Sequence, residues 1–213
     1  MKSKGYFICG TDTNVGKTFI SALLVKALDA DYWKPIQCGD LENSDTMTVR
    51  KFVGPNFGGV LHREKYALKL PQSPHLAARS EHIKIHLDDF ILPQSESLIL
   101  VEGAGGCLAP INEEETILDL VEHLNLPLIL VTRFYLGAYN HTLMSLESIQ
   151  RRDLRIEGLI LNDGDNPDFR DYITRKTKLD FLGIVPKLSL DNSVEMAHLV
   201  KTLRDENYER LVR

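Results

Sequence analysis

The chain has 213 residues, of which 43% are hydrophobic and 26% charged, and these fractions exclude the disordered, collagen-like and coiled-coil classes. Its 25 basic and 30 acidic residues give a net charge of −5, so nucleic acid is not an expected partner, because phosphate backbones are bound by basic surfaces. The length predicts a single domain over residues 1–213.

The cysteines and the apolar runs indicate the compartment. Cys9, Cys38 and Cys107 are widely spaced and form no C-x-x-C pair, which argues against a disulfide framework and against a zinc site. The first ten residues hold only a short apolar run, and the longest later run, residues 126–131, contains a proline. Signal peptides and membrane spans need longer apolar segments. We expect a soluble, cytoplasmic protein with no membrane partner.

Short apolar runs alternate along the chain with segments of helical spacing, which predicts a doubly wound, mainly parallel α/β sheet. The predicted strands are residues 6–9, 32–36, 98–101, 128–131, 159–161 and 182–185. The predicted helices are residues 17–28, 116–124, 137–150 and 194–203. Residues 52–94, which are interrupted by glycines and prolines, predict loops and short helices, and residues 204–213 predict a solvated helix end.

The first predicted strand leads into a variant phosphate loop, Gly10-Thr-Asp-Thr-Asn-Val-Gly16-Lys17-Thr18. The strict pattern G-x-x-x-x-G-K-[ST] needs a glycine one residue later, at Thr11. A glycine-containing turn before a helix still presents backbone N–H groups to phosphate oxygens. Lys17 would reach the β- and γ-phosphates of ATP, and the Thr18 hydroxyl would bind Mg²⁺. The alternative is a turn with a chance Gly-Lys-Thr.

Acidic and basic side chains follow two other predicted strands. Glu102 ends the strand at residues 98–101, where phosphate-loop enzymes carry a second Mg²⁺ ligand; the alternative is an acidic strand end before a flexible turn. Lys34 lies inside an apolar run, where an ammonium needs an anionic partner such as an ATP phosphate. Asp45 is a third candidate Mg²⁺ neighbour, and its alternative is the N-terminal cap of a helix over residues 46–53.

Together the motifs resemble the dethiobiotin synthetase family, the ATP-dependent cyclo-ligases of biotin biosynthesis. The resemblance implies that 7,8-diaminopelargonate and CO₂ form a carbamate, which takes the γ-phosphate of MgATP to give a carbamic-phosphoric anhydride. The second amine then closes the ring of dethiobiotin, and ADP and phosphate are released. The matching segments, in the family's order, are GTDTNVGKT (10–18), KPIQCG (34–39), SD (44–45), SPHLAA (73–78), VEGAGG (101–106), LPLILV (126–131), LGAYNH (136–141), LND (161–163) and VPKL (185–188).

The resemblance also implies roles for individual residues. Lys17 and Lys34 resemble the catalytic cations that flank the carbamate and the transferring phosphoryl group, and Thr18, Asp45 and Glu102 resemble the Mg²⁺ ligands. The implied ATP contacts are Asn14, Val15, Gly16, Lys17, Thr18, Phe19, Asp45, Glu102, Gly103, Ala104, Gly105, Asn162, Asp163, Pro186, Lys187 and Leu188, of which the last five resemble the adenine pocket.

The implied substrate contacts include one residue that differs from the family pattern and a group of residues from a second subunit. Cys38 stands where serine or threonine is expected to contact the diamine, and nearby Lys34 and Lys17 would lower the pKa of its thiol; the alternative is a packing role. The resemblance further implies a homodimer in which the neighbouring subunit binds the carboxylate of the diamine. The physical candidate for this anion site is the start of the predicted helix at residues 137–150, where Gly137 and Asn140 have free N–H groups.

Two other classes share the phosphate loop. A cobyrinate-type amidoligase usually carries an extra glutaminase domain, for which this chain has no residues. A partition or positioning ATPase, which is a nucleotide-switched binding protein, carries a lysine just after the first loop glycine, where this chain has Thr11. The cyclo-ligase is therefore the favoured interpretation, and the switch ATPase is its alternative.

Overall fold

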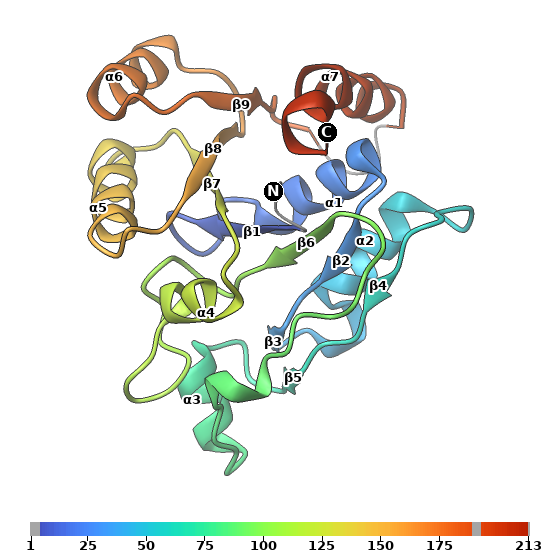
Figure 1. The fold of residues 1–213 in the computed structure, drawn as a ribbon, viewed down its shortest axis with the longest axis vertical. Helices are drawn as coiled ribbons and strands as arrows, with labels where there is room; N and C mark the ends of the chain where they lie inside the picture. Colours follow the sequence, from blue (N-terminus) through green and yellow to red (C-terminus); the bar gives the residue numbers. More distant parts are fainter. Residues whose placement is uncertain (1–4, 189–192, 213) are drawn as a thin grey trace.

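Seven parallel strands form the centre of the structure, a computed structural model that describes residues 5–188 and 193–212 (Figure 1). The strand order is β4-β2-β6-β1-β7-β8-β9, and neighbouring strands pair in parallel. The predicted parallel α/β sheet is thereby confirmed. The strands of this sheet are β1 (Gly5–Gly10), β2 (Asp31–Trp33), β4 (Leu61–His62), β6 (Ile99–Glu102), β7 (Leu128–Arg133), β8 (Ile156–Asn162) and β9 (Phe181–Ile184).

Helices cover both faces of the sheet, as Figure 1 shows for α4 to α6 on one side and α1 and α7 on the other. Alternate residues of β1 explain the two layers: Phe7 and Cys9 belong to the core under α4 and α5, whereas Tyr6 and Ile8 belong to the core under α1 and α7. The α-helices are α1 (Lys17–Leu28), α2 (Asp45–Val53), α3 (Pro74–Ser80), α4 (Ile117–Leu124), α5 (Ala138–Gln150), α6 (Pro167–Thr177) and α7 (Ser193–Leu211).

The predicted strand at residues 32–36 is present but shorter than expected, because the chain leaves the main sheet after Trp33. Pro35 has no N–H group to donate to a strand ladder. Its carbonyl instead accepts hydrogen bonds from the N–H groups of Lys65 and Tyr66, at 2.9 and 3.0 Å. The chain continues as β3 (Ile36–Cys38), which pairs with β5 (Tyr66–Leu68) in a separate two-stranded sheet. Lys34 is thus left at the carboxyl end of β2.

Residues 52–94 only partly match the prediction of loops and short helices. Helix α3 and the short 3₁₀ helix η2 (Leu87–Asp89) are present, but β4 and β5 lie there too. These strands have two and three residues, and such short runs carry no readable alternation of apolar and polar side chains. A second 3₁₀ helix, η1 (Leu41–Asn43), precedes α2.

The C-terminal part also differs from the prediction. Helix α7 continues to Leu211, and the side chains of Asn207 and Leu211 are buried, so the described residues 204–212 pack one side of the helix against the core and are not a fully solvated helix end. The buried residues alternate with exposed charged ones, which obscures the apolar face in the sequence. Helix α6 was not predicted, although Asn166 caps it by accepting a hydrogen bond from the N–H of Phe169, and Pro167 stands at its first position.

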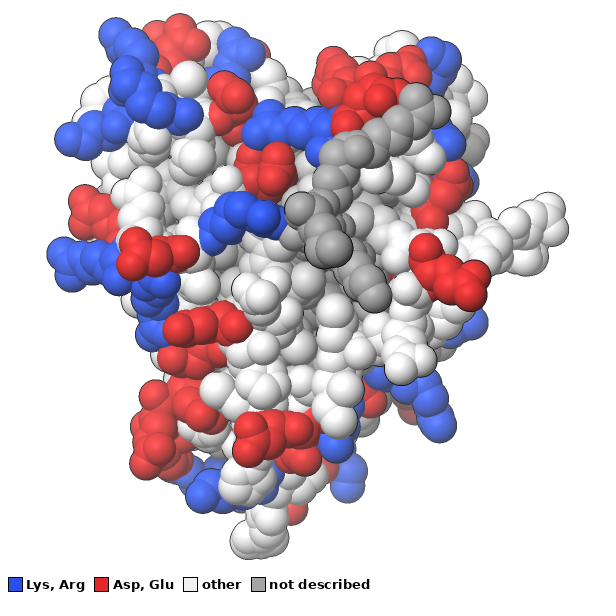
Figure 2. Space-filling model, in the orientation of Figure 1, with Lys and Arg blue, Asp and Glu red and all other residues white. Residues whose placement is uncertain are grey.

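Two surface properties follow from the described part of the chain. No helix in residues 5–188 and 193–212 combines the length and the apolar character needed to cross a bilayer. On the face drawn in Figure 2, basic side chains lie among acidic ones and do not gather into one continuous basic patch.

Asn207 offers a test of how α7 is attached to the edge strand β9. Its amide donates to the carbonyl oxygens of Leu182 (2.8 Å) and Leu203 (3.0 Å). Asn207→Ala leaves the buried Leu182 carbonyl without this partner, so the free energy of unfolding should fall by about 1–3 kcal/mol in urea denaturation. Exposed Glu206→Ala is the matched control, with an expected change within about 0.5 kcal/mol. Equal effects of the two substitutions would contradict the assigned role of Asn207.

Candidate active site at the carboxyl ends of the strands

The variant phosphate loop joins β1 directly to α1. Asn14 and Gly16 adopt left-handed conformations, with φ of 52° and 91°. A Cβ atom on Gly16 would lie 2.1 Å from the amide nitrogen of Asn162, so no larger residue fits there. That amide donates to the carbonyl oxygen of Val15 at 3.0 Å. The side chain of Asn162 therefore holds the loop, which is a contact that the sequence did not indicate.

Lys17 lies in the first turn of α1 and folds back over the loop. Its Nζ atom donates to the carbonyl oxygen of Asp12 at 3.0 Å, and the side chain is almost fully buried. Burial lowers the pKa of Lys17 below its usual value, and the positive charge of Lys34 lowers it further. A buried cation with a carbonyl as hydrogen-bond partner favours a bound anion, as phosphate binding requires.

Glu102 is the carboxylate around which the site is arranged. It lies at the end of β6, fully buried, beside Ile8 of β1. Its Oε1 atom accepts hydrogen bonds from the Thr18 hydroxyl (2.8 Å) and from Lys34 Nζ (2.9 Å). Its Oε2 atom accepts a hydrogen bond from the hydroxyl of Tyr32 (2.9 Å), a residue that the sequence analysis missed. The signal for Tyr32 is its spacing, since it lies two residues before Lys34 and on the same face of β2.

Lys34 is buried between two carboxylates. Its Nζ atom lies 2.6 Å from Asp45 Oδ2 and 2.9 Å from Glu102 Oε1, and it also donates to the carbonyl oxygen of Gly103 at 3.1 Å. Burial alone would lower the pKa of Lys34, but the two carboxylates outweigh burial and raise it above its usual value. Lys34 therefore stays charged at neutral pH. The expected anionic partners exist, but in this structure they are carboxylates of the protein.

Asp45 is the first residue of α2 and is not its cap. The cap is Ser44, whose Oγ atom accepts a hydrogen bond from the N–H of Met47 at 3.3 Å, so the alternative reading of Asp45 as a cap is wrong. Burial raises the pKa of Asp45, but the ammonium of Lys34 outweighs burial and lowers it overall. The Asp45 carboxylate therefore does not cap the helix and instead forms an ion pair with Lys34.

The donor set fits a hard divalent cation. Thr18, Asp45 and Glu102 supply a hydroxyl and two carboxylates, which are the oxygen ligands that Mg²⁺ takes in nucleotide sites. The buried ammonium of Lys34 touches both carboxylates, which shows that positive charge is favoured between them.

A pocket of about 910 Å³ joins these groups to the region of Cys38. It runs from the phosphate loop over the carboxylates to the segment at residues 71–74. Gln37, which also lines it, accepts a hydrogen bond from the N–H of Asp45 at 3.2 Å and was not predicted. The predicted site residues that line this pocket are Asn14, Gly16, Lys17, Thr18, Lys34, Cys38, Asp45, Glu102, Ala104 and Gly105.

Other predicted site residues lie outside the pocket. Asp163 and Lys187 are close to each other, with 3.9 Å between Oδ1 and Nζ, beyond the ends of β8 and β9. Val15 is buried beneath the loop, and Phe19 packs against the core under α1. Gly137 caps α5 and Asn140 is exposed in its first turn. The predicted residues that do not line the pocket are Val15, Phe19, Gly103, Gly137, Asn140, Asn162, Asp163, Pro186, Lys187 and Leu188.

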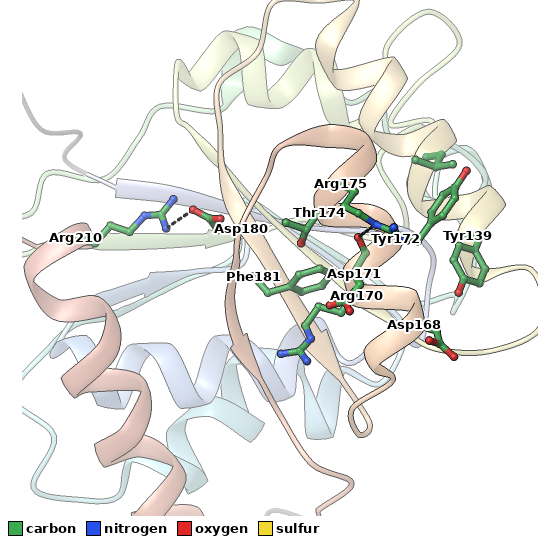
Figure 3. A pocket seen from close by; sticks show the side chains of 11 residues that line it. Tyr139, Asp168, Arg170, Asp171, Tyr172, Thr174, Arg175, Asp180, Phe181 and Arg210 are labelled. Carbon is green, nitrogen blue, oxygen red and sulfur yellow. Dashed lines mark hydrogen bonds and ion pairs between the residues drawn. The ribbon is translucent and has the colours of Figure 1, made fainter.

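A larger hollow of about 1190 Å³ lies at the other edge of the sheet, between α5, α6, β9 and α7 (Figure 3). It contains no residue of the phosphate loop. Two of its arginines pair with acidic side chains: Arg210 with Asp180 and Glu157, and Arg170 with Asp165. The smaller pocket, which Lys17 and Lys34 line, is therefore the candidate active site.

The surroundings of the cysteines correct the expectation for Cys38. Burial raises the pKa of the Cys38 thiol to about 11 and outweighs the lowering effect of Lys34, so the expected thiolate is wrong. The ammonium of Lys34 is already neutralised by its two carboxylates. Cys9 and Cys107 are buried in the core with 3.0 Å between their Sγ atoms.

Cys38 should therefore be alkylated slowly at neutral pH. A pKa of about 11 leaves about a hundredfold less thiolate than a pKa near 9. The rate of iodoacetamide labelling, followed by peptide mass spectrometry, should rise through the alkaline range towards pH 11. A cysteine introduced at the exposed position of Glu96 serves as the control and should label rapidly near pH 8. Labelling of Cys38 as fast as that control would contradict the neutral thiol.

The fold is similar to those of solved nucleotide-binding proteins. A plasmid partition protein of Borrelia burgdorferi bound to AMPPNP superposes with a TM-score of 0.58 at 14% identity, covering 96% of this chain and 97% of that one. The septum site-determining protein MinD of Pyrococcus horikoshii, complexed with Mg-ADP, gives 0.57 at 14% identity and covers 95% of each chain. Residues 4–193 match the family described as an AAA domain. Fold and site thus define a protein of the phosphate-loop nucleotide-binding class.

Curated relatives narrow this class to one family. The chain is 39% identical over 208 residues to the ATP-dependent dethiobiotin synthetase of Cytophaga hutchinsonii, across 97% of this chain and 100% of the relative. It is 43% identical over 180 residues to that of Christiangramia forsetii, across 84% and 86% of the two chains. The chain belongs to the ATP-dependent dethiobiotin synthetase family.

Proposed function

We propose that the protein closes the ureido ring of dethiobiotin from 7,8-diaminopelargonate, CO₂ and ATP, with Mg²⁺ as its metal. Family membership supports the reaction. The observation that carries the site assignment is the convergence of Lys17, Thr18, Lys34 and two carboxylates on one pocket.

The reaction has three steps. One amine of the diamine adds to CO₂ and loses a proton, which gives a carbamate. A carbamate oxygen attacks the γ-phosphorus of ATP while the bond to ADP breaks, and the product is a mixed anhydride. The second amine attacks the carbonyl carbon, the bond from that carbon to the phosphate oxygen breaks, and phosphate leaves as the ring closes. Each step separates or moves negative charge, so placed cations are the main contribution that a protein can make.

The chain's residues match that requirement. The phosphate loop and the N-terminus of α1 would bind the phosphates, with Lys17 beside the transferring group. Lys34 lies across the pocket, where a carbamate from the direction of Cys38 would meet it. Thr18, Asp45 and Glu102 would hold Mg²⁺, which supplies charge neutralisation at the phosphate oxygens. We assign the predicted adenine contact to the region of Asp163 and Lys187, next to the loop.

Release of phosphate from MgATP tests this function directly. Release should require both diaminopelargonate and bicarbonate, and it should match the formation of dethiobiotin mole for mole, because each ring closure consumes one anhydride. Omitting either substrate should abolish it. Steady release without the diamine would contradict the ligase and favour a nucleotide-switched ATPase.

Lys34→Gln tests the assignment of catalysis to this lysine. The substitution removes a cation that faces the developing charge, so turnover should fall at least about a hundredfold, while an ATP analogue should bind nearly as to the wild type. Lys26→Gln, on the exposed side of α1, is the matched control and should keep full activity. Melting curves of both variants report whether the fold is intact. Normal turnover with weakened ATP binding would reassign Lys34 to the nucleotide.

We also propose a homodimer built on the apolar surface at the start of α5. Phe134, Leu136, Tyr139 and Met144 are exposed there, with Leu136 at 101% and Met144 at 56%. A run of exposed apolar side chains marks an interaction surface, and a two-fold axis would bury it twice. Gly137 and Asn140 lie on the same segment, so the interface would bring them to the neighbouring subunit's pocket.

Two measurements test the dimer and its shared site. Leu136→Asp should give monomers in light scattering, because it buries a charge in the interface, whereas Ile91→Asp, at an exposed apolar residue outside this surface, should not. Asn140→Asp should be inactive, because its negative charge repels the carboxylate of the diamine. Mixing it with inactive Lys34→Gln should restore about a quarter of wild-type activity, because half of the randomly mixed dimers carry one intact site. An active monomer, or no recovery in the mixture, would contradict the shared site.

A further inference from the structure

Glu102 presents two carboxylate oxygens to two different sets of partners. Oε1 faces the pocket side and accepts from Thr18 and Lys34 at 2.8 and 2.9 Å. Oε2 accepts from the hydroxyl of Tyr32 at 2.9 Å. Tyr32 is fully buried and is not part of the pocket lining. Its hydroxyl therefore reaches Glu102 from the protein interior and not from the side where substrates would bind.

The register of the sheet explains why Tyr32 reaches this carboxylate. Tyr32 of β2 pairs with Leu100 of β6, and Glu102 is two residues further along β6 on the same face. Diagonal neighbours of this kind lie within the reach of an aromatic side chain. The ring packs in the core under α1, and the hydroxyl finds its partner in Glu102. The contact is thus fixed by two adjacent strands and needs no loop.

Both residues that donate to Oε1 would also act in the proposed reaction, whereas Tyr32 would not contact the substrate or the metal. Lys34 would share its charge with the carbamate, and the Thr18 oxygen would face the metal. We propose that Tyr32 is a positioning residue that keeps the Glu102 carboxylate oriented toward the metal while Lys34 changes partners. This inference rests on the proposed role of Glu102 as a metal ligand. Hydrogen bonds that orient a metal ligand from behind commonly affect metal affinity as much as tenfold to a hundredfold.

Tyr32→Phe removes only the hydroxyl and keeps the ring. The Glu102 Oε2 atom then loses its buried donor, and the carboxylate can rotate out of its orientation. Tyr6→Phe is a matched control, because Tyr6 is also buried in the same core and its hydroxyl donates to the carbonyl oxygen of Leu211, far along the chain from the site. A general loss of packing or of a buried hydrogen bond should affect both variants equally.

The experiment measures binding and not only activity. Mn²⁺ replaces Mg²⁺ as a paramagnetic probe, and its affinity is titrated by electron paramagnetic resonance in the presence of a non-hydrolysable ATP analogue. Tyr32→Phe should weaken Mn²⁺ binding at least about tenfold, leave binding of the metal-free analogue unchanged and lower kcat at limiting metal. Tyr6→Phe should bind Mn²⁺ as the wild type does, and both variants should show similar melting temperatures.

A third variant separates this inference from the proposed function. Glu102→Gln should weaken Mn²⁺ binding if the proposed metal site is right. If Glu102→Gln weakens it and Tyr32→Phe does not, the role of Tyr32 is overturned while the metal site stands. If Glu102→Gln leaves Mn²⁺ binding unchanged, the proposed metal site itself is wrong, and the role of Tyr32 falls with it.

A spectroscopic measurement keeps the inference testable if Tyr32→Phe does not fold. Protein labelled with 3-fluorotyrosine reports each tyrosine by ¹⁹F NMR. The chain has seven tyrosines, so single substitutions of the other six by phenylalanine assign their signals, that of Tyr6 included, and leave the remaining signal to Tyr32. At saturating ATP analogue, added Mg²⁺ should shift the Tyr32 signal and leave that of Tyr6 in place. A Tyr32 signal that does not respond to the metal would overturn the proposal.

Discussion

The buried ion pair network of Lys34 with Asp45 and Glu102 is the interaction on which the rest of the site depends. Lys34 and Glu102 are both almost fully buried, and an unpaired charge at either position would destabilise the fold. Removing one partner of such a pair typically lowers the free energy of unfolding by about 3–5 kcal/mol. The network ties together three separate parts of the chain: the end of β2, the start of α2 and the end of β6. Through Thr18 it also contacts the phosphate loop. These contacts therefore fix the positions of Lys34 and of the three proposed metal ligands relative to one another.

The backbone prepares this network before any side chain contributes to it. Pro35 ends the pairing of β2, so that Lys34 lies just beyond the carboxyl end of this strand. Ser44 takes the capping role of α2 and leaves the Asp45 carboxylate available. The parallel register puts Glu102 beside the last residues of β1, next to the phosphate loop. These three features bring opposite charges to the carboxyl ends of neighbouring strands, which is where open parallel sheets bind their ligands.

Much of this arrangement could be predicted from the sequence, and the failures have physical reasons. Continuous apolar runs identified the buried strands, and the glycine-lysine-threonine signature located the phosphate loop. The side-chain partners were harder, because a sequence shows that Lys34 needs an anion but not which one. Tyr32 was missed because a tyrosine within a strand is common in any core. Gln37 was missed because a polar residue shortly after a proline is common in any turn. The pKa of Cys38 was wrong because the charge of Lys34 is already balanced by carboxylates that come from distant parts of the chain.

The central claim is that this pocket phosphorylates a carbamate, and the fate of one oxygen atom tests it most directly. When CO₂ labelled with ¹⁸O is used in a single turnover, the oxygen that bridges carbon and phosphorus in the anhydride should leave with phosphate. Mass spectrometry of the released phosphate should therefore find one labelled oxygen per molecule, in step with the formation of dethiobiotin. Phosphate that forms at the same rate without the label would show that ATP is hydrolysed by water, and it would contradict the account.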